Sequence, residues 1–195
     1  SFVEGRYQGG NPVAYPSDPM KKTASSTRPH SRKPALDVEP RSRSLVGHTA
    51  IVTGSSKGLG KAMAIALGDA GAKVVINYFN AKEQAERALE EVRSRGIDAV
   101  MIRADVTNER QVKKLVDDTT KRLGPPDIAV FNATPDQPQM PIEKYDWGFH
   151  QQMLDFFVKS PFLMTRAMLP RMKKKKFGRI INIGSEVFRR GVPNF

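Results

Sequence analysis

Residues 49–60 read TAIVTGSSKGLG, a short apolar run that leads into a loop with three glycines. A run of this length, bounded by turn residues, predicts a buried β-strand. Behind the loop, apolar residues recur at helical spacing until Gly71, and we expect them to line one face of a helix: Leu59, Ala62, Met63, Ala66, Leu67 and Ala70. The segment therefore predicts a strand, a tight glycine turn and a helix, which is the repeating unit of parallel α/β sheets.

The alternation of strand and helix continues along the chain. We expect further strands at residues 73–78, 99–104, 127–131 and 179–183, and helices at 81–95, 108–122 and 146–172. Two of these helices should bury apolar faces, made of Ala85, Ala88, Leu89 and Val92 in one and of Val112, Leu115, Val116 and Thr119 in the other. Because crossovers between parallel strands are right-handed, the predicted fold class is α/β with a Rossmann-like, doubly wound parallel sheet, truncated after the fifth strand.

In such a sheet, ligands bind outside the carboxyl ends of the strands, where the strand order reverses. Glycines or polar residues directly follow each predicted strand. We expect them along one edge of the sheet: residues 54–60, Asn77, Asp105, Asn132 and Ser185. Five segments that are far apart in the sequence should thus converge on one site.

Residues 1–45 differ in composition from the rest of the chain, because they are rich in Pro, Ser and Arg and lack periodic apolar positions. We interpret them as a flexible basic extension, and residues 46–195 as one α/β domain that is incomplete at its C-terminus. No run of about 20 apolar residues is present that would predict a membrane span. The lack of cysteine fits a reducing compartment, and we expect a cytoplasmic protein.

The formal net charge of +12 suggests nucleic-acid binding, because contacts with phosphates dominate that interaction. Much of the excess is local, in residues 1–45 and in the basic run from Arg171 to Arg179, and no recognition motif accompanies it. Nucleic-acid binding is therefore disfavoured, and a basic nucleic-acid-associated protein on this fold stays an alternative. The histidines have no metal-ligand spacing, so no metal site is expected.

The glycine-rich loop is the strongest functional signal. Glycines allow the tight turn and let the backbone approach a pyrophosphate, while unpaired amides and the dipole at the helix N-terminus attract the anion. The phosphate loop of nucleotide triphosphatases does not fit, because its first glycine would fall on Ser55 and its final hydroxyl on Ala62. Residues 53–60 therefore favour a dinucleotide over a nucleoside triphosphate or a merely structural turn.

The motif T-G-x-x-x-G-x-G at residues 53–60 resembles that of short-chain dehydrogenases/reductases rather than the G-x-G-x-x-G of longer-chain dehydrogenases. Asp105 and Val106 are similar to the family's Asp-Val segment, whose carboxylate contacts adenine. Asn132 and Ala133 stand in the place of the family's Asn-Asn-Ala-Gly motif. The resemblance implies a nicotinamide dinucleotide with these candidate binding residues: Gly54, Ser56, Lys57, Gly58, Leu59, Gly60, Asn77, Tyr78, Asp105, Val106, Asn132 and Ala133.

Residues 178–185, GRIINIGS, resemble the strand that delivers the family's catalytic serine, which assigns that role to Ser185. The resemblance covers residues 45–195 and looks closest to 3-oxoacyl-acyl-carrier-protein reductases and related sugar or alcohol dehydrogenases. It implies hydride transfer between the nicotinamide and a small carbonyl or alcohol substrate. In the family, a tyrosine with a lysine four residues later exchanges a proton with the substrate. That pair is expected after Phe195, so we interpret the chain as truncated and inactive in turnover.

The coenzyme preference depends on the end of the second strand, where NAD enzymes of the family usually carry an acidic residue for the ribose hydroxyls. Asn77 stands there instead, so no carboxylate repels a 2′-phosphate. Lys57 lies in the glycine loop, where NADP-preferring members often have a basic residue. The sequence favours NADP(H), with NAD(H) as the alternative.

Two positions depart from the family pattern. The asparagine that holds a proton-relay water in the family aligns with Phe157, whose apolar ring cannot hold water. Thr134 replaces the last glycine of Asn-Asn-Ala-Gly, and Pro135 restricts it further. A noncatalytic NAD(P)-binding regulatory protein on the same fold therefore stays open as an alternative.

Aromatic residues are frequent in the long helix predicted at residues 146–172. We expect them to pack this helix against the sheet or against a neighbouring subunit: Trp147, Phe149, Phe156, Phe157 and Phe162. Because the family often forms tetramers through this helix, we expect a homo-oligomer, either a tetramer or a dimer, for the intact protein.

Overall fold

The computed structural model describes residues 44–138 and 141–185, which build one five-stranded sheet and its helices. The strands are β1 (Thr49–Val52), β2 (Lys73–Tyr78), β3 (Ala99–Arg103), β4 (Ile128–Phe131) and β5 (Arg179–Asn182). All neighbours pair in parallel, in the order β3-β2-β1-β4-β5. The central strand β1 pairs through Ile51 with Val75 on one side and Ala129 on the other. The order reverses between β1 and β4, which confirms the predicted doubly wound class.

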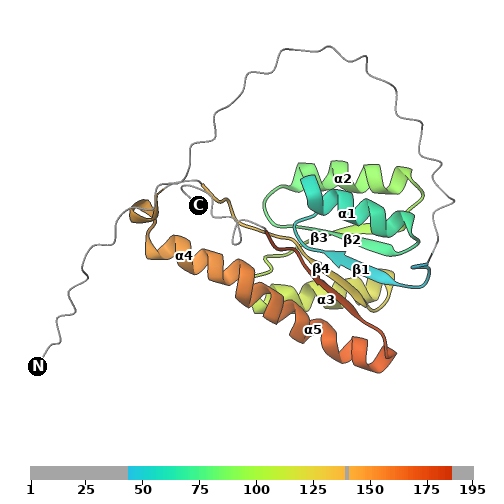
Figure 1. Cartoon of the computed structure of the whole chain (residues 1–195). Coiled ribbons are helices and arrows are strands. Elements are labelled where there is room, and N and C mark those ends of the chain that lie inside the picture. The colour runs from blue at the N-terminus through green and yellow to red at the C-terminus, as the bar shows by residue number, and fades with distance from the viewer. Residues whose placement is uncertain (1–43, 139–140, 186–195) are drawn as a thin grey trace, which may run out of the picture. The chain divides into compact units, whose positions relative to one another are not determined.

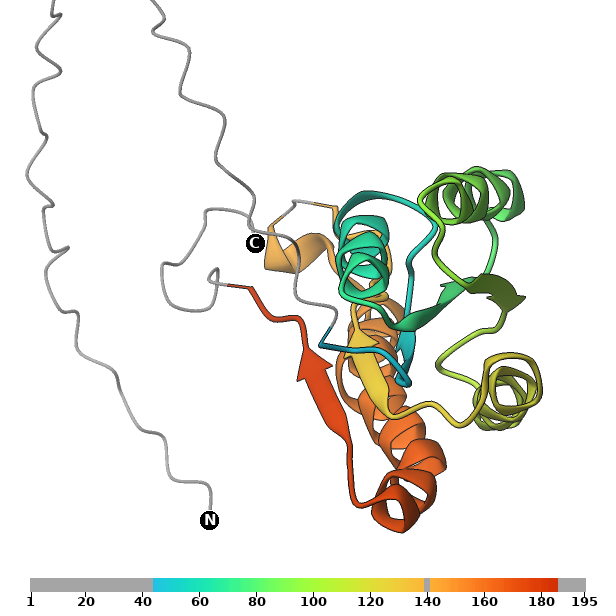
Figure 2. The same cartoon turned by 90° about the vertical axis from the view of Figure 1, so that its right-hand side faces the viewer.

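Helices cover both faces of the sheet, as Figure 1 and Figure 2 show. One face carries α1 (Gly58–Asp69) and α2 (Lys82–Ser94), and the other carries α3 (Glu109–Leu123) beside α5 (Ser160–Lys175). Before α5 come η1 (Ile142–Lys144), α4 (Trp147–Leu154) and a π-helical segment, η2 (Asp155–Lys159). The helix predicted at 146–172 is therefore continuous along the chain but changes its hydrogen-bond pattern in η2.

The buried faces of α2 and α3 are those that the sequence predicts. In α2, Ala85, Ala88 and Val92 are buried, and Leu89 packs half-buried against the same core cluster. All four residues predicted for α3 are buried as well. These two helices lie against β2 and β3 on opposite faces of the sheet, and each contributes to the apolar layer on its side.

The buried face of α1 is not the one that apolar spacing predicts. Its buried residues are all small: Gly60, Ala64 and Gly68. Leu59 is 60% exposed, and the other predicted residues are half-buried or exposed. Small residues at every fourth position let α1 pack closely, since a Cβ on Gly68 would lie only 2.5 Å from Cγ2 of Ile97.

The aromatic residues of α4, η2 and α5 divide between core and surface. Phe156 packs against the core cluster, and Phe149 is half-buried. Trp147, Phe157 and Phe162 are 70%, 45% and 57% exposed. Packing against the sheet is therefore wrong for these three residues, whereas packing against a neighbouring subunit stays a prediction.

A buried ion-pair network lies at the amino ends of the strands. Asp127, which is 1% exposed, lies 2.8 Å from Nδ1 of His48 and accepts a hydrogen bond of 3.1 Å from the amide of Thr49. Lys175, at the end of α5, forms an ion pair with the same carboxylate. These contacts tie β1, β4 and α5 together at the edge opposite to the predicted site.

Candidate functional site

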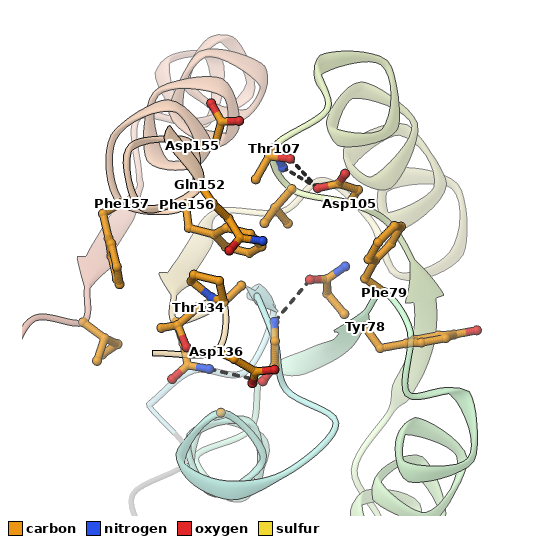
Figure 3. Close-up of a pocket in the computed structure, with 18 of the residues that line it drawn as sticks. Tyr78, Phe79, Asp105, Thr107, Thr134, Asp136, Gln152, Asp155, Phe156 and Phe157 are labelled. Atoms are coloured by element: carbon orange, nitrogen blue, oxygen red, sulfur yellow. Dashed lines mark hydrogen bonds between the residues drawn. The ribbon is translucent and has the colours of Figure 1, made fainter. Parts of the chain in front are cut away.

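A cleft of about 1280 Å³ opens at the carboxyl ends of the strands (Figure 3). Every residue that the sequence assigns to the coenzyme or to catalysis lines it: Gly54, Ser56, Lys57, Gly58, Leu59, Gly60, Asn77, Tyr78, Asp105, Val106, Asn132, Ala133 and Ser185. The structure thus brings together five segments that are distant in the sequence. Because small-molecule sites commonly have about 300–1,000 Å³, the cleft has room for an extended dinucleotide and a small second molecule.

The loop between β1 and α1 brings the first turn of α1 to the cleft. Gly54 and Gly58 have φ angles of 62° and 54°, in the left-handed region that residues with a side chain disfavour. A Cβ on Gly60 would lie 2.5 Å from the carbonyl oxygen of Gly54 and 2.6 Å from Nδ2 of Asn132. The N-cap residue, Lys57, makes no capping bond with its side chain. The amides of the first turn of α1 therefore remain available to an anion at the positive end of the helix.

Asn77, at the end of β2, fixes the position of this loop. Its side chain accepts a hydrogen bond of 3.2 Å from the amide of Gly54 and donates to the carbonyl oxygens of Ile102 and Ala104 at 3.4 and 3.1 Å. Its own amide donates to Oγ of Ser55 at 3.0 Å. Asn77 is only 2% exposed and its side chain holds the loop, whereas its predicted place at the ribose stays a prediction.

The residues after Asn77 divide between core and cleft. Tyr78 is 8% exposed and belongs to the core cluster with α2, and Figure 3 shows its ring pointing away from the cleft. Phe79, Asn80 and Ala81 line the cleft, although the sequence analysis did not select them. The signal that could have identified them as cleft residues is their place directly after a predicted strand. No residue from 77 to 81 is acidic.

The loops after β3 and β4 present ordered polar groups. Oδ1 of Asp105 accepts hydrogen bonds from the amide and the hydroxyl of Thr107 at 2.8 and 2.7 Å, which fix the carboxylate. Nδ2 of Asn132 donates to the carbonyl oxygens of Thr53 and Gly54 at 3.0 and 3.2 Å. Asn132 therefore holds the loop after β4 against the glycine loop.

The two lysines near the glycine loop differ in their partners. Lys61 on α1 pairs with Glu91 on α2 at 2.6 Å, and this hydrogen bond lowers the pKa of Glu91 below its ordinary value. Lys57 is exposed at the rim of the cleft and forms no ion pair with any residue that the structure describes. Lys57 is thus the lysine with its charge available to an anionic ligand.

The opposite end of the cleft combines α4, η2 and the loop after β5. Ser185, which is exposed, lines this part together with Thr134 and Gln152. In a π-helical segment each backbone hydrogen bond spans one residue more than in an α-helix. Both Phe156 and Phe157 of η2 line the cleft, with Phe156 packed on the core and Phe157 45% exposed. An exposed aromatic ring therefore occupies the position that the sequence comparison assigns to the family's asparagine.

Within residues 44–138 and 141–185, no three His, Asp or Glu side chains group as a metal ion would require. No helix in those ranges combines the length and apolar character of a membrane span.

The sequence model for short chain dehydrogenases matches residues 48–195. The chain belongs to this family. The match confirms the resemblance that the glycine motif indicates, and it makes the chain a member of a family of oxidoreductases.

Named relatives include 3-oxoacyl-[acyl-carrier-protein] reductases. The enzyme of Staphylococcus aureus (strain N315) is 33% identical over 147 residues, which are 74% of this chain and 58% of the relative. The enzyme of Synechocystis sp. is 36% identical over 151 residues, which are 76% of this chain and 60% of the relative. The chain therefore spans about three fifths of the length of these curated relatives.

A solved structure of a gluconate 5-dehydrogenase from Burkholderia cenocepacia, in complex with NADP and tartrate, is similar to this chain with a TM-score of 0.71. The two sequences are 30% identical, and the match covers 80% of this chain and 60% of that one. This likeness agrees with the Rossmann-like α/β class seen in the sheet order.

Proposed function

We propose that this chain is the coenzyme-binding part of an NADP(H)-dependent oxidoreductase, which transfers hydride between the nicotinamide and a small carbonyl or alcohol substrate. The observation that carries the proposal is the uncapped N-terminus of α1, whose first-turn residues line a cleft of dinucleotide size. Membership of the short chain dehydrogenases supports the reaction class. The names of the relatives support a 3-oxoacyl compound as the substrate class.

The residues of the cleft fit a nicotinamide dinucleotide. The amides of Gly58 and Gly60 would hold the pyrophosphate, and the helix dipole would stabilise its negative charge. The carboxylate of Asp105, which Thr107 orients, would accept a hydrogen bond from the adenine amino group. The bound coenzyme supplies or accepts the hydride, while the chain binds and orients both reactants.

At the substrate end, we assign to Ser185 a hydrogen bond to the reacting oxygen of the substrate. A hydroxyl in this place stabilises the charge that develops on that oxygen during hydride transfer. The rings of Phe156 and Phe157 line the same end and supply apolar contacts for the substrate. The expected selectivity is therefore for a small molecule with one carbonyl or hydroxyl group and an apolar portion.

The preference for NADP(H) over NAD(H) follows from charge. Lys57 lies at the rim without an ion-pair partner among the described residues, and residues 77–81 offer no carboxylate that would repel a 2′-phosphate. The structural relative named above was solved with NADP. Calorimetric titration of the purified chain with NADPH and with NADH tests both the binding of a nicotinamide coenzyme and the preference for NADP(H). We expect tighter binding of NADPH; tighter binding of NADH would overturn the preference, and no binding of either would overturn the function.

A noncatalytic NAD(P)-binding regulatory protein is the second candidate. Two residues of the cleft favour it, because Phe157 replaces the family's relay asparagine with an exposed ring and Thr134 replaces a glycine of the loop beside the nicotinamide. An absorbance assay separates the enzyme from the regulatory protein. The intact protein that contains this chain is mixed with NADPH and a 3-oxoacyl thioester, and the loss of NADPH absorbance is measured. Turnover supports the enzyme, and coenzyme binding without turnover of any carbonyl substrate supports the regulatory protein.

We further propose that residues 46–195 form the coenzyme-binding domain and that the residues before them in the sequence form a basic extension. We also propose that the intact protein is a cytoplasmic homo-oligomer, either a dimer or a tetramer. Trp147, Phe157 and Phe162 support self-association, because their exposed rings lie on consecutive helical segments. Light scattering of the intact protein measures its mass, and a monomer at all concentrations would contradict the assembly.

A further inference from the structure

Phe79 stands where the chain leaves β2, and its side chain belongs to the cleft rather than to the core. It is 41% exposed and lines the cleft, whereas the preceding Tyr78 is buried. Figure 3 shows the ring of Phe79 pointing toward Asp105 at the same end of the cleft. The ring therefore presents a flat aromatic surface to a ligand that binds beside Asp105.

Arg103 braces Phe79 from the neighbouring strand. The register of β2 and β3 puts Arg103 opposite Tyr78. Nε of Arg103 donates a hydrogen bond of 2.9 Å to the carbonyl oxygen of Phe79, and its guanidinium carbon lies 5.0 Å from the centroid of the Phe79 ring. One contact acts on the backbone and the other on the ring, so together they restrict both the loop and the rotation of the side chain.

A guanidinium over one face of an aromatic ring leaves the opposite face free for stacking. Purine bases stack readily on aromatic side chains, because every base has a π-face. The carboxylate of Asp105, fixed by Thr107, offers a hydrogen-bond acceptor at the same end of the cleft. A flat π-surface and an edge acceptor together match the two recognition features of an adenine ring.

We propose that Phe79 stacks on the adenine ring of the coenzyme and that Arg103 is a positioning residue that holds Phe79 for this contact. The inference rests on the proposed dinucleotide site and identifies what recognises its adenine half. Arg103 is absent from the described residues that line the cleft, whereas Phe79 is among them. Arg103 therefore acts through Phe79 and not on the ligand itself.

The variants Phe79→Leu and Phe79→Tyr form a matched pair, because leucine keeps an apolar side chain without an aromatic face and tyrosine keeps the face. Phe79→Leu should weaken the binding of NADPH and NADH alike by about 5- to 150-fold, the range expected for lost base stacking. Phe79→Tyr should keep the wild-type affinity for both NADPH and NADH. Calorimetry measures these constants. Reduced nicotinamide mononucleotide, which lacks adenosine, should bind Phe79→Leu and the wild type equally in a titration followed by NMR.

The variant Arg103→Lys tests the brace, since lysine keeps the charge but lacks the planar group and the Nε–H donor. It should weaken NADPH and NADH equally, by about 3- to 10-fold, and add no further loss to Phe79→Leu. Arg87→Lys, at an exposed site on α2, is the control and should leave both affinities unchanged. A loss confined to NADPH would overturn the brace, because it would mean that Arg103 contacts the 2′-phosphate.

The outcomes separate this inference from the proposed function. A wild-type chain that binds neither NADPH nor NADH contradicts the function itself. A wild-type chain that binds them, while Phe79→Leu keeps full affinity, contradicts adenine stacking alone. If Phe79→Leu also weakens the adenine-free mononucleotide, its effect is a general disruption of the cleft, and the stacking role is overturned.

Discussion

Replacement of Gly60 by alanine tests the geometry of the glycine loop. The added Cβ would lie 2.5 Å from the carbonyl oxygen of Gly54, 2.6 Å from Nδ2 of Asn132 and 3.0 Å from Cα of Ser55. Carbon and oxygen atoms in contact need about 3.3 Å or more, so the Gly54 carbonyl must move by roughly 0.8 Å. Because that atom belongs to the backbone, the whole loop moves with it.

Gly60→Ala has two opposite effects on the free energy of unfolding. Alanine is favoured over glycine inside a helix by about 0.8–1.0 kcal/mol, whereas overpacking a close contact costs about 1–3 kcal/mol. The steric cost wins, and we expect the free energy of unfolding in urea to fall by about 1–2 kcal/mol. The effect on binding is larger: a displacement of this size misplaces the amides at the start of α1, and NADPH affinity should fall by about 10- to 100-fold in calorimetry.

Gly68→Ala is the matched control, because it makes the same change on the same helix. Its Cβ would also come within 2.5 Å of another atom, but that atom is Cγ2 of Ile97, in a flexible side chain outside the cleft lining. Gly68→Ala should therefore change the free energy of unfolding but leave the NADPH affinity as it is in the wild type. Full NADPH affinity in Gly60→Ala, or equal losses in both variants, would refute the role assigned to the loop.

Three further substitutions test other parts of the molecule. Asp127→Ala removes the buried carboxylate that pairs with Lys175 and leaves the buried amide of Thr49 without its acceptor, and it should lower the free energy of unfolding by about 1–3 kcal/mol in urea; a loss below about 0.5 kcal/mol would speak against the network. Lys57→Gln should weaken NADPH about 5- to 20-fold in calorimetry and leave NADH unchanged, whereas equal weakening of both would exclude a contact with the 2′-phosphate. Because the hydrogen bond from Lys61 lowers the pKa of Glu91, this pair stabilises the fold above the ordinary value of 4.5, and the stabilisation is lost as the pH falls through the lowered pKa. The stability difference between the wild type and Lys61→Gln, measured in urea, should therefore exist near neutral pH and shrink in acid; a difference independent of pH would rule out the charge pair as its cause.

The sheet was predictable from sequence because its strands are short, mainly apolar runs and the helices α2 and α3 are amphipathic. The prediction for β2, residues 73–78, agrees with the structure at both ends, and the helix at 81–95 differs by one residue at each end. The convergence of Asp105, Asn132 and Ser185 on one cleft followed from a simple rule, since all three lie just after parallel strands.

Other features depend on contacts that a linear pattern does not contain. The buried face of α1 consists of Gly60, Ala64 and Gly68, which carry little apolar surface and so give no hydrophobic signal. The partners of Asn77 are carbonyl groups on and after β3, and the brace of Phe79 by Arg103 depends on the register of two strands. Neither relation can be read from the spacing of residues along the chain.

The central claim is that the backbone amides in the first turn of α1 bind the phosphates of a nicotinamide dinucleotide. Titration of the ¹⁵N-labelled chain with NADPH, followed by amide chemical shifts, examines those groups individually. We expect the amides of Gly58, Leu59 and Gly60 to undergo large shifts that saturate together as NADPH is added. NADPH binding that leaves these three amides unshifted, or a spectrum that does not respond to NADPH or NADH at all, would contradict the claim.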